Sequence, residues 1–290
     1  MQSSNNASAD TTEGAVEESK DRAEAQPRNV LEKGIIYFFT RGRVGVDDLE
    51  SVQDLQRSYF VLRPLPDGAK LGDGKLEDTD NNRLLALPKK VWPKSGKDKF
   101  MAFVEKGKTT IKDLKEDFFR GSEYNTKTTG VRQTPPVTTV GEGIYAITST
   151  GQRGESHLAY MLTIPKEVGE LQKDIGINSQ GAFVMSLKNP ESKGPANAAL
   201  PTKPEWPSEF QDEFRGRSWM PVEPKHLNYD SAQILLIGED IETGSALEAT
   251  KEDQQNDKKE TPNEEMEKLE HEDEVRVEHM KGKFQPCNLY

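Results

Sequence analysis

Short apolar runs rich in β-branched and aromatic residues recur along the middle of the chain, and they constrain its fold most. The clearest lie at residues 34–40, 57–63, 143–149, 157–164, 181–187 and 232–237, with weaker candidates at 83–87 and 100–105. Glycine, proline and small polar residues, which favour turns, bound most of these runs. The pattern predicts a fold built mainly on antiparallel sheet.

Helical signals are few and short. Residues 111–119 place apolar side chains at helical spacing behind a start signal at Thr110. Residues 166–175 follow Pro165, and proline suits the first position of a helix. Residues 208–215 form a further short candidate. Together with the strands, these segments predict the α+β fold class.

The charge of the chain is concentrated at its two ends. The whole chain carries −11, whereas residues 31–240 are almost neutral at −1. Apolar residues make up only 33% of the chain and charged residues 31%, a composition that favours disorder in the most acidic segments. We therefore predict a single domain over residues 30–240, between disordered acidic tails at 1–29 and 241–290. A neutral domain lacks the large basic surface that nucleic-acid binding requires.

The acidic C-terminal tail contains one structural signal. Thr261 and Glu264 form a capping box, with Pro262 at the first helical position. Opposite charges follow at i,i+4 spacing, and the apolar residues do not sustain a heptad repeat. A solvated helix over 262–280 is expected.

The sequence Pro-Lys-x-Val occurs twice, at residues 88–91 and 165–168, each time between two strand candidates. One interpretation is an ancestral duplication that produced two pseudo-repeated halves, at 30–121 and 141–240. Chance similarity explains a match of this length equally well. The sequence leaves both interpretations open.

The loop at 148–157, with the sequence TSTGQRGESH, carries the most suggestive local chemistry. Small residues expose backbone N–H groups, and an arginine and a histidine nearby suit an anion such as phosphate. The alternative is a hairpin loop in which the glycines and serines only satisfy turn geometry. The candidate anion or ligand residues are Ser149, Thr150, Arg153, Ser156 and His157.

A basic loop at 88–99 is the second candidate site, with five lysines and a tryptophan in twelve residues. Basic side chains beside an aromatic ring can bind nucleic acid or an acidic partner. Such a run is more often a solvated loop. The candidate residues are Lys89, Lys90, Trp92, Lys94, Lys97 and Lys99.

Common catalytic signatures are missing from the sequence. It contains no P-loop, no dinucleotide-binding glycine motif, no nucleophile elbow and no zinc-protease helix. Its one cysteine, Cys287, excludes a disulfide within the chain and a cysteine-based zinc site. The spacing of His157 and His226 does not indicate a metal site. We assign no catalytic, metal-binding or cofactor-binding residue and favour a non-catalytic protein.

The first 30 residues contain no apolar segment typical of a signal peptide. The longest apolar runs, such as 234–237, are far too short to cross a membrane. The cytoplasm or the nucleus is the expected compartment, with no membrane partner and no secretion.

Several sequence blocks occur together that are similar to those of a known family. They are NVLEKGIIYFF at 29–39, RGRVG at 41–45, QRSY at 56–59, VLRPLP at 61–66, GAKLG at 68–72, RLLALPKKV at 83–91, GEG at 141–143, ESHLAY at 155–160, GPAN at 194–197, LLIGE at 235–239 and ETPNEEMEKLE at 260–270. With them, the chain closely resembles a filamentous-fungal family commonly labelled "BTB domain transcription factor", over most of residues 29–280. The label implies a role linked to transcription and protein partners.

A BTB domain is a mostly helical dimerisation module with a small sheet, and no such pattern is recognisable in these strand-rich residues. We expect a non-catalytic protein-interaction protein, associated with transcription as the label implies. One alternative is a small-ligand-binding protein or an enzyme with its site near 148–157. The other is nucleic-acid binding through 88–99, which requires those lysines to share a face with Arg41, Arg43 and Arg132. A convergent polar pocket would favour the first alternative, and an exposed apolar patch would favour protein interaction.

Overall fold

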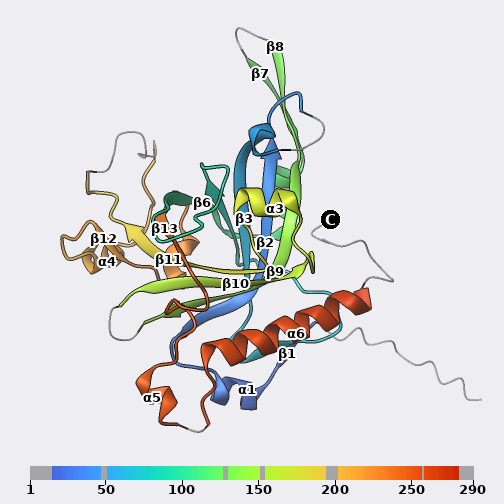
Figure 1. Cartoon of the computed structure of the whole chain (residues 1–290). Coiled ribbons are helices and arrows are strands. Elements are labelled where there is room, and N and C mark those ends of the chain that lie inside the picture. The colour runs from blue at the N-terminus through green and yellow to red at the C-terminus, as the bar shows by residue number, and fades with distance from the viewer. Residues whose placement is uncertain are drawn as a thin grey trace, which may run out of the picture.

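Eight antiparallel strands close into a barrel, in the order β2-β3-β5-β6-β13-β11-β10-β9 around its wall (Figure 1). The computed structural model describes residues 15–46, 51–126, 130–150, 154–193, 202–256 and 258–280. The strands of the wall are β2 Val30–Gly42, β3 Leu55–Pro64, β5 Asn82–Leu87, β6 Lys99–Thr109, β9 Val137–Ser149, β10 Ser156–Ile164, β11 Gln180–Lys188 and β13 Gln233–Glu239. The expectation of mainly antiparallel sheet with short helices is confirmed, and closure into a barrel goes beyond it.

The other strands extend or decorate this wall. β12 Trp219–Pro221 pairs with the end of β11, and β1 Val16–Glu18 pairs with β4 Ala69–Leu71. β7 Ser122–Thr126 and β8 Gly130–Thr134 form a hairpin that projects from one end of the barrel (Figure 1).

The helical segments are short, except for the last. They are α1 Lys20–Ala25, η1 Val52–Asp54, α2 Ile111–Asp113 with η2 Leu114–Phe119, α3 Glu170–Ile175, α4 Ser208–Glu213, η4 Pro224–Asn228, α5 Lys251–Gln254 and α6 Pro262–Met280. The helices expected at 111–119 and 208–215 are present, whereas the one expected from 166 begins only at Glu170.

The barrel consists of two four-stranded meanders. β2, β3, β5 and β6 are neighbours in both chain and wall, and so are β9, β10, β11 and β13. The first strands of the two meanders, β2 and β9, pair with each other, and so do the last strands, β6 and β13. A twofold relation between the meanders would therefore match their third strands, β5 and β11. The two Pro-Lys-x-Val segments instead follow β5 and β10. They therefore do not occupy equivalent positions of the two meanders.

Alternate side chains of the strands fill the interior of the barrel, as the two-residue period of a strand requires. Phe38 and Phe60 each contact Trp92 with ring centroids 5.1 Å apart, and Tyr160 and Phe183 complete this aromatic cluster. An eight-stranded barrel is just wide enough for side chains to fill. Its interior is accordingly an apolar core.

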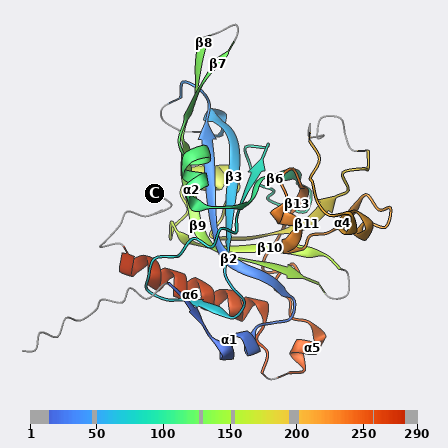
Figure 2. The ribbon, with the colours of Figure 1, turned by 180° about the vertical axis from the view of Figure 1, so that it is seen from behind.

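Helix α6 lies along the outer wall of the barrel, next to β9, β10 and β4 (Figures 1 and 2). Met266 and Leu269 on its inner face are each 1% exposed. The expected bounds of 262–280 agree with the structure, but the expectation of a solvated helix is wrong. The physical reason is that its apolar and charged side chains find buried partners on the wall, which sequence spacing within the helix does not reveal.

The expected disordered tail at 1–29 is also wrong for residues 15–29, because they form β1 and α1 against the barrel. Arg22 of α1 donates to Glu265 and Glu272 of α6, at 2.7 and 2.6 Å. These ion pairs therefore join α1, near the N-terminus, to α6, near the C-terminus. Residues 1–14 lie outside the described residues.

Candidate functional site

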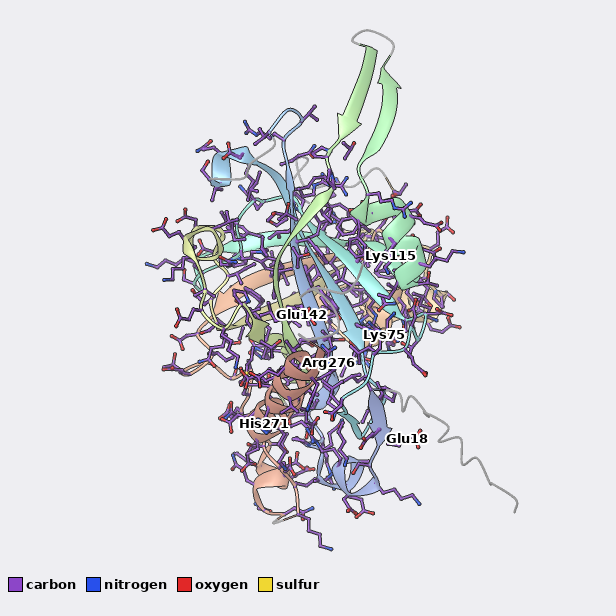
Figure 3. All side chains as sticks on the ribbon, turned by 90° about the vertical axis from the view of Figure 1, so that its right-hand side faces the viewer. Glu18, Lys75, Lys115, Glu142, His271 and Arg276 are labelled. Carbon is purple, nitrogen blue, oxygen red and sulfur yellow. The ribbon has the colours of Figure 1, made fainter. Side chains whose placement is uncertain are left out.

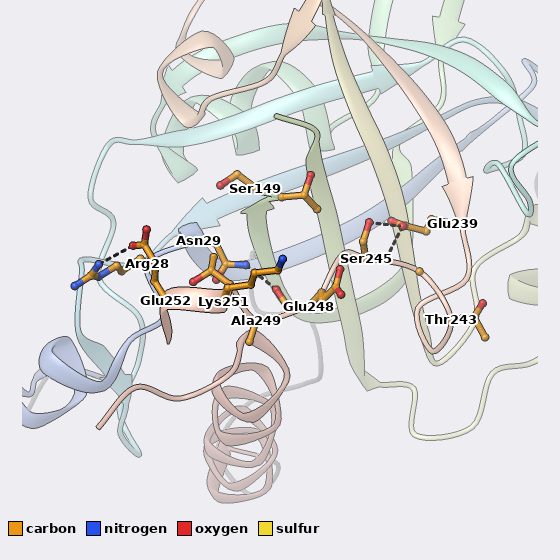
Figure 4. Close-up of a pocket in the computed structure, with 13 residues that line it drawn as sticks. Arg28, Asn29, Ser149, Glu239, Thr243, Ser245, Glu248, Ala249, Lys251 and Glu252 are labelled. Carbon is orange, nitrogen blue, oxygen red and sulfur yellow. Dashed lines mark hydrogen bonds and ion pairs between the residues drawn. The ribbon is translucent and has the colours of Figure 1, made fainter. Parts of the chain in front are cut away.

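A polar cleft of about 990 Å³ opens where β9 ends and the segment after β13 passes across it (Figure 4). Its lining comes from three parts of the chain: residues 28–29 before β2, residues 149–150 at the end of β9, and residues within 239–252. The volume lies at the upper end of the range of small-molecule sites, roughly 300–1,000 Å³.

Local hydrogen bonds hold these three segments together. The backbone N–H of Ser149 donates to the carbonyl oxygen of Asn29 at 2.9 Å. Thr148 Oγ1 donates to the carbonyl oxygen of Ala246 at 2.6 Å, and Asn29 Nδ2 donates to that of Glu248 at 2.8 Å. The end of β9 thus fixes both sides of the cleft.

Asn29 carries an unsatisfied acceptor in this cleft. Its side chain is 5% exposed, and its Oδ1 atom accepts no hydrogen bond from any described residue. Leaving a buried polar group without a partner costs about 1–3 kcal/mol.

Glu239 provides a carboxylate whose two oxygens are hydrogen-bonded by His157 and Ser245. Its Oε2 lies 2.6 Å from Nδ1 of His157, and its Oε1 accepts from the backbone N–H of Ser245 at 2.8 Å. Burial alone would raise the pKa of Glu239, but the hydrogen bonds from His157 and Ser245 outweigh burial and lower it. Glu239 is therefore ionised at neutral pH.

His157 supports this carboxylate and does not itself line the cleft. Its side chain is 0% exposed, and its Nε2 atom is buried without a hydrogen-bond partner among the described residues. A general base must come within hydrogen-bond reach of the proton it removes. In this arrangement His157 can orient Glu239 but cannot touch a molecule in the cleft.

The remaining charges of the cleft are mixed. Arg28 is paired with Glu252 at 3.0 Å, whereas the side chains of Lys251 and Glu248 form no ion pair with a described residue. The cleft thus offers one unpaired ammonium and several acceptors to a ligand.

The structure separates the five residues predicted from the 148–157 loop. Ser149 and Thr150 line the cleft, and His157 reaches it through Glu239. Ser156 is buried and donates to the carbonyl oxygen of Val222 at 2.7 Å, away from the cleft. Arg153 lies outside the described residues.

Sequence reasoning missed Asn29, Glu239 and the segment from Ser245 to Glu252. Barrel closure brings them to the end of β9 from distant parts of the chain. The signal in the sequence was indirect: a small polar loop beside a strand end indicated two residues that line the cleft, Ser149 and Thr150, but not the residues that face them.

The basic loop at 88–99 does not present its aromatic ring. Trp92 is 1% exposed because it fills the barrel interior, so its assignment to a surface patch is wrong. Lys90 and Lys94 donate to backbone carbonyl oxygens, including that of Lys173 at 2.9 Å for Lys94. These two lysines connect the loop to η1 and α3.

The other lysines of this loop remain on the surface. Lys97 and Lys99 are exposed, and Lys89 lies 5.8 Å from the ring centroid of Phe100. Arg41, which nucleic-acid binding would need on the same face, instead donates to the carbonyl oxygen of Phe118 at 2.8 Å. The stacking platform required for binding of single strands is not formed by Trp92.

Within the described ranges, no three or more His, Cys, Asp or Glu side chains gather as a group that could hold a metal ion. No helix among the described residues combines the length and the apolar character needed to cross a membrane.

Comparisons with known proteins gave no match: no family model fits the sequence, and no curated protein or solved structure is significantly similar.

Proposed function

We propose that this protein is a non-catalytic small-ligand-binding protein, and that the cleft at the end of β9 binds a polar small molecule. The observation that carries the proposal is a cleft of about 990 Å³ whose lining combines the carboxylates of Glu239 and Glu248 with the ammonium of Lys251.

The chemistry of the lining selects the class of ligand. The carboxylates of Glu239 and Glu248 accept hydrogen bonds. They favour a molecule that presents amine or hydroxyl donors. Lys251 can bind an acidic group of the same molecule, so polyols, amines and amino-acid-like zwitterions fit best.

The other interpretations have less support from the described residues. Partner binding would be favoured by an exposed apolar patch. Among the described residues, the exposed large apolar side chains are Val44, in the turn after β2, and Trp219 of β12. The transcription-linked, partner-binding role implied by the family resemblance stays a prediction, as does nucleic-acid binding through the lysines of the 88–99 loop.

Ligand-observed NMR with the full chain tests the proposal, using a panel of amino acids, polyamines and polyols. We expect at least one class to bind the wild-type protein and to bind more weakly to Ser149→Leu, whose larger side chain takes up part of the cleft. Ser208→Leu is the matched control, because Ser208 is an exposed residue at the start of α4. Equal binding to both variants, or no binding from any class, would overturn the proposal.

A further inference from the structure

A second, smaller cleft lies at the C-terminal end of β11, at Lys188. It encloses about 300 Å³. Its polar lining includes three lysines and three hydroxyl side chains, namely Lys188, Lys193, Lys203, Ser192, Thr202 and Ser231. None of these residues belongs to the cleft at the end of β9.

Lys188 is the informative residue of this cleft. It is 8% exposed, and it forms no ion pair or side-chain hydrogen bond with any described residue. The stem of Lys188 is buried, but its Nζ atom is not among the buried atoms that lack a partner, so the ammonium still reaches solvent at the cleft. An anion in the cleft would supply the missing partner.

The charges around Lys188 favour an anion as well. Lys193 and Lys203 are exposed at the rim and also lack an ion pair with a described residue. Among the described lining residues, Glu191 is the only one with an acidic side chain. The described lining therefore carries three positive charges and one negative charge.

The hydroxyl groups add hydrogen-bond donors. Thr202 Oγ1 and Ser231 Oγ lie 2.9 Å apart, so one of them donates to the other. Whichever oxygen accepts that bond keeps its own proton for a ligand. An oxyanion can thus receive both charge-assisted and neutral hydrogen bonds here.

The backbone around Lys188 is fixed in place. Lys188 pairs with Trp219 of β12, and the side chain of the next residue, Asn189, bonds to the carbonyl oxygen of Arg217 and the N–H of Glu191 at 2.9 Å each. A rigid site loses little entropy when it binds. The backbone that carries Lys188 is therefore fixed between β11 and β12 (Figure 1).

We propose that this cleft binds a phosphate-type oxyanion, as inorganic phosphate or as the phosphoryl group of a small phosphomonoester. A phosphate group has several acceptor oxygens and a charge near −2, which match three lysines and several hydroxyl donors. The volume suits a group of this size and leaves room for only a small substituent. The site is independent of the proposed ligand cleft.

Isothermal titration calorimetry of the full chain at constant ionic strength tests the proposal, with inorganic phosphate and phenyl phosphate as probes. We expect saturable binding, weakened at least tenfold in Lys188→Met and partly retained in Lys188→Arg. Lys112→Met is the matched control: Lys112 is an exposed lysine of α2, which lies away from β11 and α4 (Figure 2). It should bind as the wild type does.

The double variant Lys193→Gln/Lys203→Gln covers the case in which Lys188→Met does not fold. Its exposed positions leave the core intact, and binding should weaken severalfold. Tighter binding of phenyl phosphate than of phosphate would identify a phosphomonoester, and equal binding would identify free phosphate. Absence of saturable binding to either probe, or unchanged affinity in folded Lys188→Met, would overturn the proposal.

Discussion

Arg276 of α6 forms a buried ion pair with Glu142 of β9: 3.1 Å separate Arg276 Nη2 from Glu142 Oε1, and each side chain is 6% exposed. The same guanidinium contacts Asp273 at 2.7 Å, and Asp273 accepts from Thr163 Oγ1 at 2.7 Å. Figure 3 shows Glu142 and Arg276 close together between the helix and the wall. Helix α6 is thus docked by buried charges together with a few apolar side chains.

Arg276→Met should loosen α6 from the barrel. The substitution leaves the carboxylates of Glu142 and Asp273 buried without their guanidinium, a loss that typically costs about 3–5 kcal/mol. We expect faster hydrogen exchange in α6 and a lower free energy of unfolding in urea.

Lys166→Met is the matched control for this change. Lys166 lies outside α6 and forms ion pairs with Glu274 and Glu278 of that helix, but its side chain is 57% exposed. Exposed ion pairs contribute little because water screens them. Hydrogen exchange in α6 should be unchanged in this variant, and equal loosening in both variants would contradict the role of buried charge.

The docking of α6 should also depend on pH. Burial raises the pKa of Glu142, and the neighbouring carboxylate of Asp273 raises it further, to about 7, although Arg276 acts in the opposite direction. Between about pH 4.5 and 7 the folded state holds a proton that the unfolded state has released. Stability therefore falls as pH rises through this window, by on the order of 3 kcal/mol at about 1.4 kcal/mol per pH unit.

Glu142→Gln isolates this effect, because glutamine is neutral at every pH and similar in shape. The difference in unfolding free energy between wild type and Glu142→Gln should change steadily from pH 4.5 to 7 and then level off. A constant difference across that range would show that Glu142 does not titrate there.

The sequence predicted the local elements well because their signals are local. The α6 bounds follow from a capping box that the structure contains, with Thr261 N–H donating to Glu264 at 2.7 Å. Its docking could not be predicted, because Arg276 and Glu142 are 134 positions apart. Likewise, a tryptophan among lysines does not reveal that the loop turns Trp92 into a barrel. Ser149 and Thr150 were found from loop composition, whereas Asn29 offered no such signal.

Gly143→Ala should destabilise the barrel strongly. A Cβ atom at Gly143 would lie 2.0 Å from the carbonyl oxygen of Met161 on β10, a backbone atom that cannot move without disturbing the β9–β10 pairing. Overpacking of this kind typically costs about 1–3 kcal/mol or more. The midpoint of urea unfolding measures the loss.

Gly96→Ala is the control for the glycine prediction. Its nearest non-neighbouring atom would be 3.8 Å away, and its backbone is not in the left-handed region. Because alanine restricts the unfolded chain more than glycine does, this variant should be neutral or stabilised by up to about 1 kcal/mol. A loss as large as that of Gly143→Ala would indicate a general intolerance of substitution.

Trp92→Ala should cost about 3–5 kcal/mol, since removing a large aromatic side chain from a packed core leaves a cavity. Trp92 is 1% exposed, whereas Trp219 is 39% exposed, so Trp219→Ala should change the unfolding free energy far less.

The fluorescence of Trp92, isolated in a Trp206→Phe/Trp219→Phe background, should be blue-shifted and unaffected by added oligonucleotide or by acrylamide. Quenching by either would place the indole at the surface, as the basic-loop interpretation required.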